Sequence, residues 1–250
     1  MTTRFNRLGK LLRRPDARTY RPSDGVPAVL SKIALVLSTE NVSVSGGVVD
    51  SWGTTAASGI SASLAGTTTA RPAYNATGGV GGRPLITFDG VNNFLTSIIT
   101  KGSAWSDYEI GIVGQRLSFT VANKGIAAYS LGGTPRFYIN DNTAATWRFT
   151  VVSGANVTGG NPDTAPVHIS GDAASGGTVN TRQGGTIINT TTTTVTSRPD
   201  GETWVLGASN ASALNLANYA LQAAYIGPLL TADERTALRA YLTAQTGIIC

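Results

Sequence analysis

Between residues 108 and 152 the chain consists of short apolar or alternating segments, most of them ended by Gly, Asn or Asp. These segments are YEIGIVGQ, LSFTVAN, GIAAYSLG, RFYIN and TWRFTVV. Strands that recur every ~8–12 residues with turn residues between them are typical of a β-sandwich or barrel. The composition agrees, because 30 glycines and only 13% charged residues suit many short strands joined by tight turns.

The same pattern extends to both sides of this region. Residues 28–38 predict a buried strand or a short helix, and residues 42–52 predict a hairpin with a Gly-Gly turn. Residues 84–95 predict a strand pair around an Asp-Gly turn, whereas residues 53–83, rich in Gly, Ala, Thr and Ser, predict a long, partly structured loop. Further strands are expected at residues 167–170, 178–183, 186–196, 203–208 and 220–226.

One segment near the end of the chain predicts a helix. Thr231 is a good N-cap, and Glu234 three residues later completes a capping box. Apolar residues follow at i, i+3 and i+4 from Leu238, and Gly247 has the properties of a C-terminal cap. No apolar run approaches the ~18 residues of a transmembrane helix.

The basic charge is concentrated at the start of the chain. Residues 1–32 carry eight basic and two acidic side chains, whereas the rest carries 11 basic and 12 acidic ones. We therefore divide the chain into a basic anchoring arm, residues 1–32, and a nearly neutral domain, residues 33–250. The arm can bind nucleic acid, an acidic membrane or a protein lattice, of which we favour the lattice; the body lacks the spread of basic residues that nucleic acid needs. The residues expected to anchor the arm are Arg4, Arg7, Lys10, Arg13, Arg14, Arg18 and Arg21.

The catalytic and metal-binding patterns in the sequence are weak. His168 lies in an alternating segment and is expected on a strand or in the core, without the Gly-x-Ser-x-Gly motif of a hydrolase triad. Asp107 and Glu109 have the i, i+2 spacing of a paired-carboxylate glycosidase, although an exposed strand end is the expected role. Residues 78–82 (GGVGG) lack the Lys-Ser/Thr of a phosphate loop and suggest a flexible connection. The single cysteine, Cys250, permits no internal disulfide, and we expect no cofactor or metal.

Three segments in order resemble the concanavalin A-like, laminin-G-like jelly roll of many bacterial and phage proteins. They are the Val-rich hairpin ending at Trp52; Arg71-Pro72 with Pro84, Ile86, Phe88-Asp89-Gly90, Asn92-Asn93 and Leu95; and Trp204, Leu206-Gly207-Ala208 with YIGPLLTADERTALRAYLTAQTGI. The resemblance covers residues 33–249. It implies an all-β fold of two antiparallel sheets packed face to face, with one short C-terminal helix and rim loops able to bind glycan or protein.

The resemblance and the charge pattern together predict a non-enzymatic structural protein of a phage virion. The arm would bind other virion proteins, and the jelly roll would be displayed as a decoration, spike or fibre module, with assembly in the bacterial cytoplasm and a homo-oligomer possible. The alternative is a glycan-binding module of a bacterial surface or secreted protein. Trp52 and Trp204 are expected in the core. The residues expected to contact a host-surface glycan are Trp105, Asn140, Asp141, Asn142 and Trp147.

Overall fold

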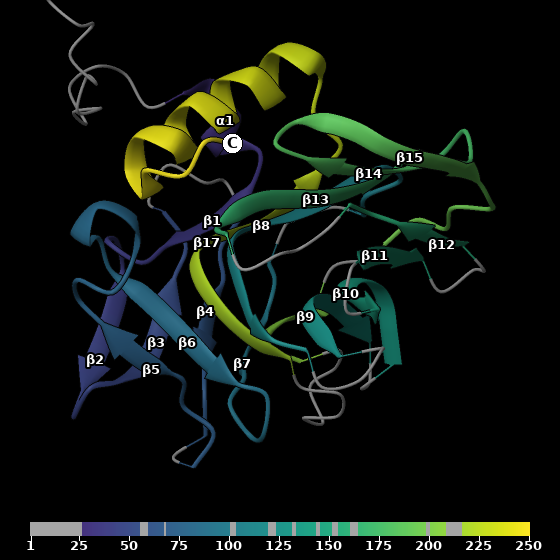
Figure 1. Ribbon diagram of the computed structural model, residues 1–250. Helices are drawn as coiled ribbons and strands as arrows, with labels where there is room; N and C mark the ends of the chain where they lie inside the picture. The colour runs from purple at the N-terminus through teal and green to yellow at the C-terminus, as the bar shows by residue number, and fades with distance from the viewer. Residues whose placement is uncertain are drawn as a thin grey trace, which may run out of the picture.

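The computed structural model describes residues 27–55, 60–67, 69–100, 104–119, 124–131, 134–143, 146–151, 155–160, 165–198, 201–208 and 217–250 (Figure 1). In these ranges the protein is nearly all-β and antiparallel, with one α-helix near the C-terminus. The arm residues 1–26, with all seven predicted anchoring cations, lie outside the described residues, so the arm stays a prediction.

The bounds of the elements follow in chain order. They are η2 (Ala28–Ser31), β1 (Ala34–Leu37), β2 (Val42–Ser45), β3 (Val48–Gly53), β4 (Ser63–Ala65), β5 (Ala73–Asn75), η3 (Val80–Gly82), β6 (Leu85–Asp89), β7 (Leu95–Ile98), β8 (Tyr108–Ser118), β9 (Gly125–Leu131), β10 (Thr134–Thr143), β11 (Thr146–Val151), β12 (Ala155–Thr158), β13 (Val167–Ala173), β14 (Thr178–Gln183), β15 (Thr186–Thr192), β16 (Thr203–Leu206), β17 (Asn218–Pro228) and α1 (Ala232–Thr246).

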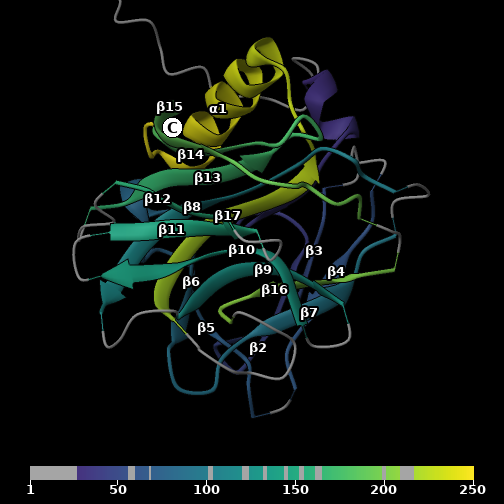
Figure 2. The ribbon, with the colours of Figure 1, turned by 90° about the vertical axis from the view of Figure 1, so that its right-hand side faces the viewer.

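The strands form two facing layers (Figure 2). In the first layer β17 pairs along one edge with β6 and then β1, and along the other edge with β8, which is followed by β13, β14 and β15. The second layer runs from β12 through β11, β10, β9, β16, β7 and β4 to β3.

The layers are connected at one side and close together at the other. Strand β5 pairs with both β3 and β6, so the hydrogen-bonded ladder passes from one layer to the other. At the opposite side the Thr181 hydroxyl of β14 donates to the Thr158 carbonyl of β12 at 3.1 Å. The all-β prediction is therefore confirmed, but the two expected sheets form a single, nearly closed sandwich.

Aromatic side chains fill the space between the layers. The Phe137 ring of β10 stacks on Tyr108 of β8 with 4.2 Å between centroids. Phe149 packs against Gly171, where a Cβ atom would come within 2.1 Å of the ring, so this position admits only glycine. Trp52 and Trp204 are fully buried in the same core, as predicted.

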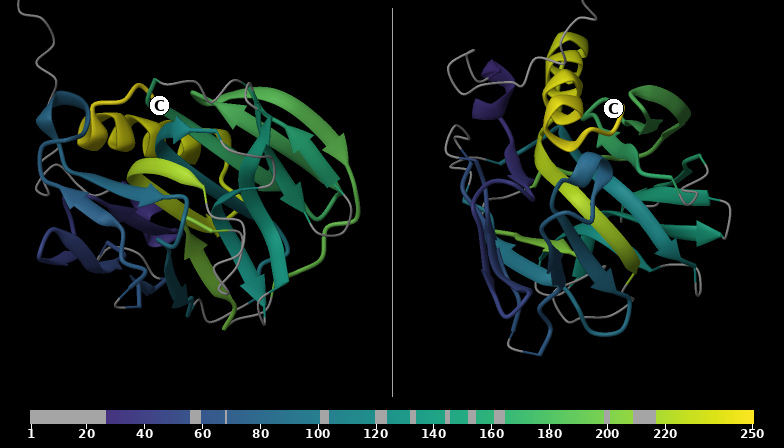
Figure 3. Two further views of the ribbon diagram at one scale, coloured as in Figure 1. Left: turned by 60° about the horizontal axis from the view of Figure 1, so that its bottom comes forward. Right: turned by 60° about the vertical axis from the view of Figure 1, so that its left-hand side comes forward.

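Helix α1 lies on the outer face of the first layer, as the two views of Figure 3 show. Its start matches the prediction: the Thr231 hydroxyl accepts from the Glu234 amide, and the Glu234 carboxylate accepts from the Thr231 amide. Gly247 adopts a left-handed conformation at φ 74° and ends the helix. Leu238 and Leu242 are buried against β1 and β17, so α1 covers this part of the sheet. No helix in the described ranges is long and apolar enough to cross a membrane.

Residues 84–95 do form two strands, but these strands do not pair with each other. Strand β6 belongs to the first layer and β7 to the second, so the Asp89-Gly90 turn crosses between layers. The Asp89 carboxylate stabilises the crossing, because Oδ1 accepts from the amides of Val91, Asn92 and Asn93 at 2.9–3.1 Å. The prediction of a local hairpin is wrong here, since a turn signal does not specify the strand's partner.

Two further segments differ from their predictions. Residues 28–38 contain both predicted alternatives, a 3₁₀ turn followed by β1. The predicted loop at 53–83 includes β4, β5 and η3, which are too short for a periodic pattern and are held by distant partners.

Candidate functional site

The predicted glycan-binding residues Asp141 and Trp147 lie opposite each other in the β10–β11 hairpin and point into the sandwich. Trp147 is fully buried, and Trp105 is 6% exposed with its ring stacked on Tyr129. Burial leaves neither indole a free face for a sugar, so the prediction that these tryptophans contact a glycan is corrected: both belong to the core.

The polar members of the predicted set also have structural partners. Asn140 is fully buried and accepts a hydrogen bond from Arg148 Nε. The Asn142 amide donates to the Thr146 hydroxyl at 3.0 Å, and its side chain is half-buried. Of the predicted set, Asn142 is therefore the residue left for a glycan contact, which stays a prediction.

Asp141 is a structural carboxylate between the two layers. Tyr219 donates to its Oδ1 at 3.2 Å, and an Arg116 nitrogen lies 3.5 Å from the same atom. Burial raises the pKa of Asp141 to about 6, and Arg116 and Tyr219 only partly oppose this. The carboxylate is enclosed by its partners and does not reach solvent.

Helix α1 covers a second group of buried charges. Arg235 of the helix lies 2.9 Å from Glu109 Oε2 and 3.7 Å from Asp172 Oδ2. Arg182 binds the same Asp172 oxygen at 2.7 Å. Tyr225 donates to Glu109 Oε1 at 3.0 Å, so both oxygens of this carboxylate are occupied. The network joins α1 to β8, β13 and β14.

His168 lies at the edge of this network. Its Nε2 is 3.2 Å from the Tyr225 hydroxyl, whose proton goes to Glu109, so the Nε2 proton is donated to Tyr225. Burial, followed by the charge of Arg239, lowers the pKa of His168 to about 4, which keeps the ring neutral. The strand position predicted for this histidine is confirmed.

The geometry does not make Asp107 and Glu109 a catalytic pair. Glu109 is buried beneath α1, where the remaining cavity of about 10 Å³ has room for no more than one water molecule. Asp107 instead accepts from the Ser175 amide at the end of the neighbouring strand. The two carboxylates therefore do not face a common cleft.

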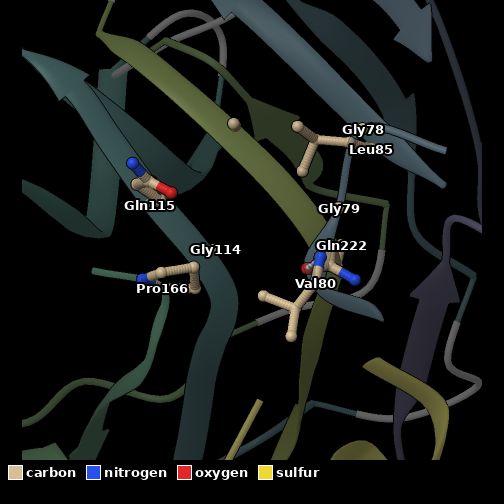
Figure 4. A pocket seen from close by; sticks show the side chains of 9 residues that line it. Gly78, Gly79, Val80, Leu85, Gly114, Gln115, Pro166 and Gln222 are labelled. Atoms are coloured by element: carbon tan, nitrogen blue, oxygen red, sulfur yellow. Dashed lines mark hydrogen bonds between the residues drawn. The ribbon is translucent and has the colours of Figure 1, made fainter. Parts of the chain in front are cut away.

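A larger pocket, with a volume of about 220 Å³, lies on the outer face of the first layer beyond the end of α1 (Figure 4). Gly114, Gln115 and Pro166 form one side, and the segment before β6 forms the other with Gln222. The described residues that line it are Gly78, Gly79, Val80, Leu85, Gly114, Gln115, Pro166, Ala220 and Gln222.

Hydrogen bonds fix the wall formed by residues 78–80. The Gly79 amide donates to the Arg83 carbonyl at 2.7 Å, and the Val80 amide donates to the Gln222 side-chain oxygen at 3.2 Å. Gln222 in turn donates to the Thr246 carbonyl at the end of α1 at 3.0 Å. A Cβ at Gly79 would lie 2.8 Å from both Arg83 O and Gln222, so glycine is required for this close approach.

Gln115 is the polar side chain that the pocket leaves available. It is half-buried on β8, and its amide has no hydrogen-bond partner among the described residues. Apolar surface from Val80, Leu85 and Pro166 surrounds it. An amide that can donate and accept, set among apolar groups, can bind a polar ligand that also has a hydrocarbon face.

Sequence reasoning missed this pocket because its walls come from four distant segments. The one local signal was the glycine-rich stretch at 78–82, interpreted as a flexible connection. It is instead a 3₁₀ turn that forms one wall.

No protein-family model and no curated protein matches this chain. Its fold is similar to Trypanosoma rangeli sialidase in complex with sialic acid, with TM-score 0.58, 9% identity and 86% of this chain covered. It is also similar to the botulinum neurotoxin serotype G binding domain, with TM-score 0.56, 10% identity and 84% covered. The binding domain of botulinum neurotoxin DC in complex with SialylT gives TM-score 0.55, 13% identity and 84% covered.

This chain spans only part of those proteins, 32% of the sialidase and 50% and 51% of the toxin domains. At such low identity the likeness shows the fold alone, which is a β-sandwich of the lectin-like kind. The similar structures include an enzyme and binding domains, so the likeness does not decide between these activities.

Proposed function

We propose that this protein is a non-enzymatic glycan-binding module of the concanavalin A-like jelly-roll type, and that the pocket around Gln115 is its binding site. The observation that carries the proposal is the pocket itself, about 220 Å³ on a lectin-like sandwich. Its Gln115 amide has no partner among the residues that the structure describes and lies among apolar groups. Protein pockets for drug-sized ligands have ~300–1,000 Å³, so this volume suits a single sugar ring at the end of a longer glycan. Two of the similar structures are complexes with sialic acid and with SialylT, which supports a glycan as the general ligand class.

A glycan array followed by titration calorimetry tests the proposal. Leu85 and Thr87 lie on the same face of β6 and are both half-buried, but only Leu85 lines the pocket. We expect Leu85→Trp to fill the pocket and weaken binding at least about tenfold. Thr87→Trp, which adds the same ring outside the pocket, should bind as the wild type does. Absence of binding to any glycan, or equal binding by both variants, would refute the proposed function.

The non-enzymatic part of the proposal has its own test. Glu109 is enclosed by Arg235 and Tyr225, which supports a structural role for this carboxylate and argues against catalysis by Asp107 and Glu109. The full chain should therefore release no product from a panel of polysaccharides. Turnover that disappears in Asp107→Asn or Glu109→Gln would establish an enzyme instead.

A structural component of a phage virion is the second candidate function, and the segregated charge favours it. Residues 1–32 carry a net charge of +6, which suits attachment to an acidic protein lattice. The sandwich would then display its pocket from the particle, and the two candidate functions are compatible. Removing residues 1–27 should abolish incorporation into particles and leave the body folded. Normal incorporation of the truncated chain would exclude anchoring by the arm.

A further inference from the structure

We infer that the pocket selects an uncharged sugar ring and rejects one that carries a carboxylate. The inference rests on the proposed function, and it concerns which class of glycan the same site accepts. Its basis is the chemistry of the described residues that line the pocket, which are glycines, aliphatic side chains, a proline and two amides, with no charged side chain among them.

A sugar carboxylate would find no cation among the described residues that line this pocket. The nearest candidate in sequence, Arg83, contributes its backbone carbonyl to the glycine wall. Its guanidinium lies instead against Gly247, where Nη1 would be 2.4 Å from an added Cβ. Proteins bind carboxylates through charge-assisted hydrogen bonds, most often from arginine, and the part of the lining that the structure describes offers no such donor.

Because a bound sugar loses part of its water in the pocket, the lack of a cation disfavours a carboxylate more than a hydroxyl group. A carboxylate that loses its water without gaining a charged partner is strongly disfavoured, whereas a hydroxyl needs only one good hydrogen bond. The Gln115 amide supplies a donor and an acceptor for hydroxyl groups. The Gln222 side chain already accepts from the Val80 amide and donates to the Thr246 carbonyl, so it forms part of the pocket wall.

The apolar side of the pocket also favours a neutral sugar. Val80, Leu85 and Pro166 present hydrocarbon surface at the positions that Figure 4 shows. The C–H face of a neutral pyranose can cover such a surface, and a volume of about 220 Å³ limits the contact to one ring. A terminal neutral hexose is therefore the ligand that the lining fits.

The test uses saccharide pairs that differ only at C6, ending in glucose or glucuronic acid and in galactose or galacturonic acid. Titration calorimetry with the full chain should show the neutral member of the bound pair preferred at least about tenfold. If the acidic member binds as well or better, the inference is overturned although the glycan-binding function stands. If no glycan of any class binds, the proposed function itself has failed.

A charge introduced into the pocket gives a second, positive test. Gln115→Arg places a guanidinium in the lining and should shift the preference toward the acidic member of the pair. The matched control is Leu117→Arg, because Leu117 lies two residues further along β8, is 43% exposed and does not line the pocket. The control should keep the neutral preference. An identical shift in both variants would mean that overall charge, and not the pocket, governs selectivity.

Discussion

Replacing Arg235 by alanine should destabilise the protein more than any other single loss of charge on α1. The Arg235 side chain is 17% exposed, and its partners Glu109 and Asp172 are 2% and 3% exposed. Asp172 keeps Arg182 at 2.7 Å and Asn180 at 2.8 Å after the change, but Glu109 keeps only the hydroxyl of Tyr225. A buried carboxylate is then left without a cation.

The magnitude follows from that burial. Breaking a buried ion pair by removing one partner costs about 3–5 kcal/mol, because the other charge stays desolvated. Burial already raises the pKa of Glu109, with Arg235 opposing it, so loss of Arg235 raises this pKa further and protonation limits the penalty. We therefore expect about 3 kcal/mol at pH 7. For a domain of this size, ~2–4 °C of Tm per kcal/mol corresponds to a fall of about 6–12 °C.

Urea unfolding and calorimetry measure the effect, with Lys32→Ala as the matched control. Lys32, which follows η2, pairs with Glu234 of α1, the helix that also carries Arg235. The Lys32 side chain is 51% exposed, so its removal should change stability by less than about 1 kcal/mol. The Arg235→Ala deficit should shrink near pH 4, where Glu109 is protonated, and a second change, Glu109→Gln, should recover part of it. Equal stabilities of Arg235→Ala and Lys32→Ala would refute the reasoning.

Three further predictions concern single residues. Burial holds the pKa of Asp141 at about 6, above the usual 3.8, so its stabilising effect is complete below pH 3.8 and is lost as pH rises through 6. Wild type should lose about 2 kcal/mol relative to Asp141→Asn between pH 4 and 7, and parallel stability curves would contradict this. The pKa of His168, lowered to about 4, predicts ring NMR shifts that stay constant from pH 8 to 5, and a midpoint near 6.5 would show an exposed ring. Thr231→Ala removes the helix cap and should cost about 1 kcal/mol in urea unfolding, whereas Thr236→Ala in the same helix should cost nothing; equal effects would argue against the cap.

Local signals predicted the elements that local interactions form. Thr231, Glu234 and Gly247 specify the ends of α1 through backbone contacts a few residues away, and the structure reproduces each of them. The turn at Gly46-Gly47 has positive φ at both residues, 57° and 80°, as a tight hairpin requires. Such features need no knowledge of the rest of the chain.

Long-range pairing could not be predicted in the same way. The turn at Asp89 carries a strong local signal, yet its two strands pair with β17 and β16 from the far end of the sequence. The burial of Trp147 follows from the β10–β11 register, which points it inward with Asp141. Register depends on tertiary contacts, and a one-residue shift would place the indole on the outside.

The candidate site depends on tertiary structure even more strongly. Gln115 and Gln222 lie on neighbouring strands and acquire different roles, because only Gln222 meets the Val80 amide and the Thr246 carbonyl. Nothing in the sequence distinguishes the two amides. The chemistry of the pocket therefore appears only when residues 78–80, β8, β17 and Pro166 are brought together.

The position of β17 has a consequence for synthesis on the ribosome. Strands β1, β6 and β8 all emerge before β17, yet all three pair with it. Until it arrives, their apolar faces and open edges are exposed to other nascent chains, a state that favours aggregation. The first layer therefore cannot form before β17 has been translated, and the yield of native protein in a cell should depend on chaperones that hold the growing polypeptide.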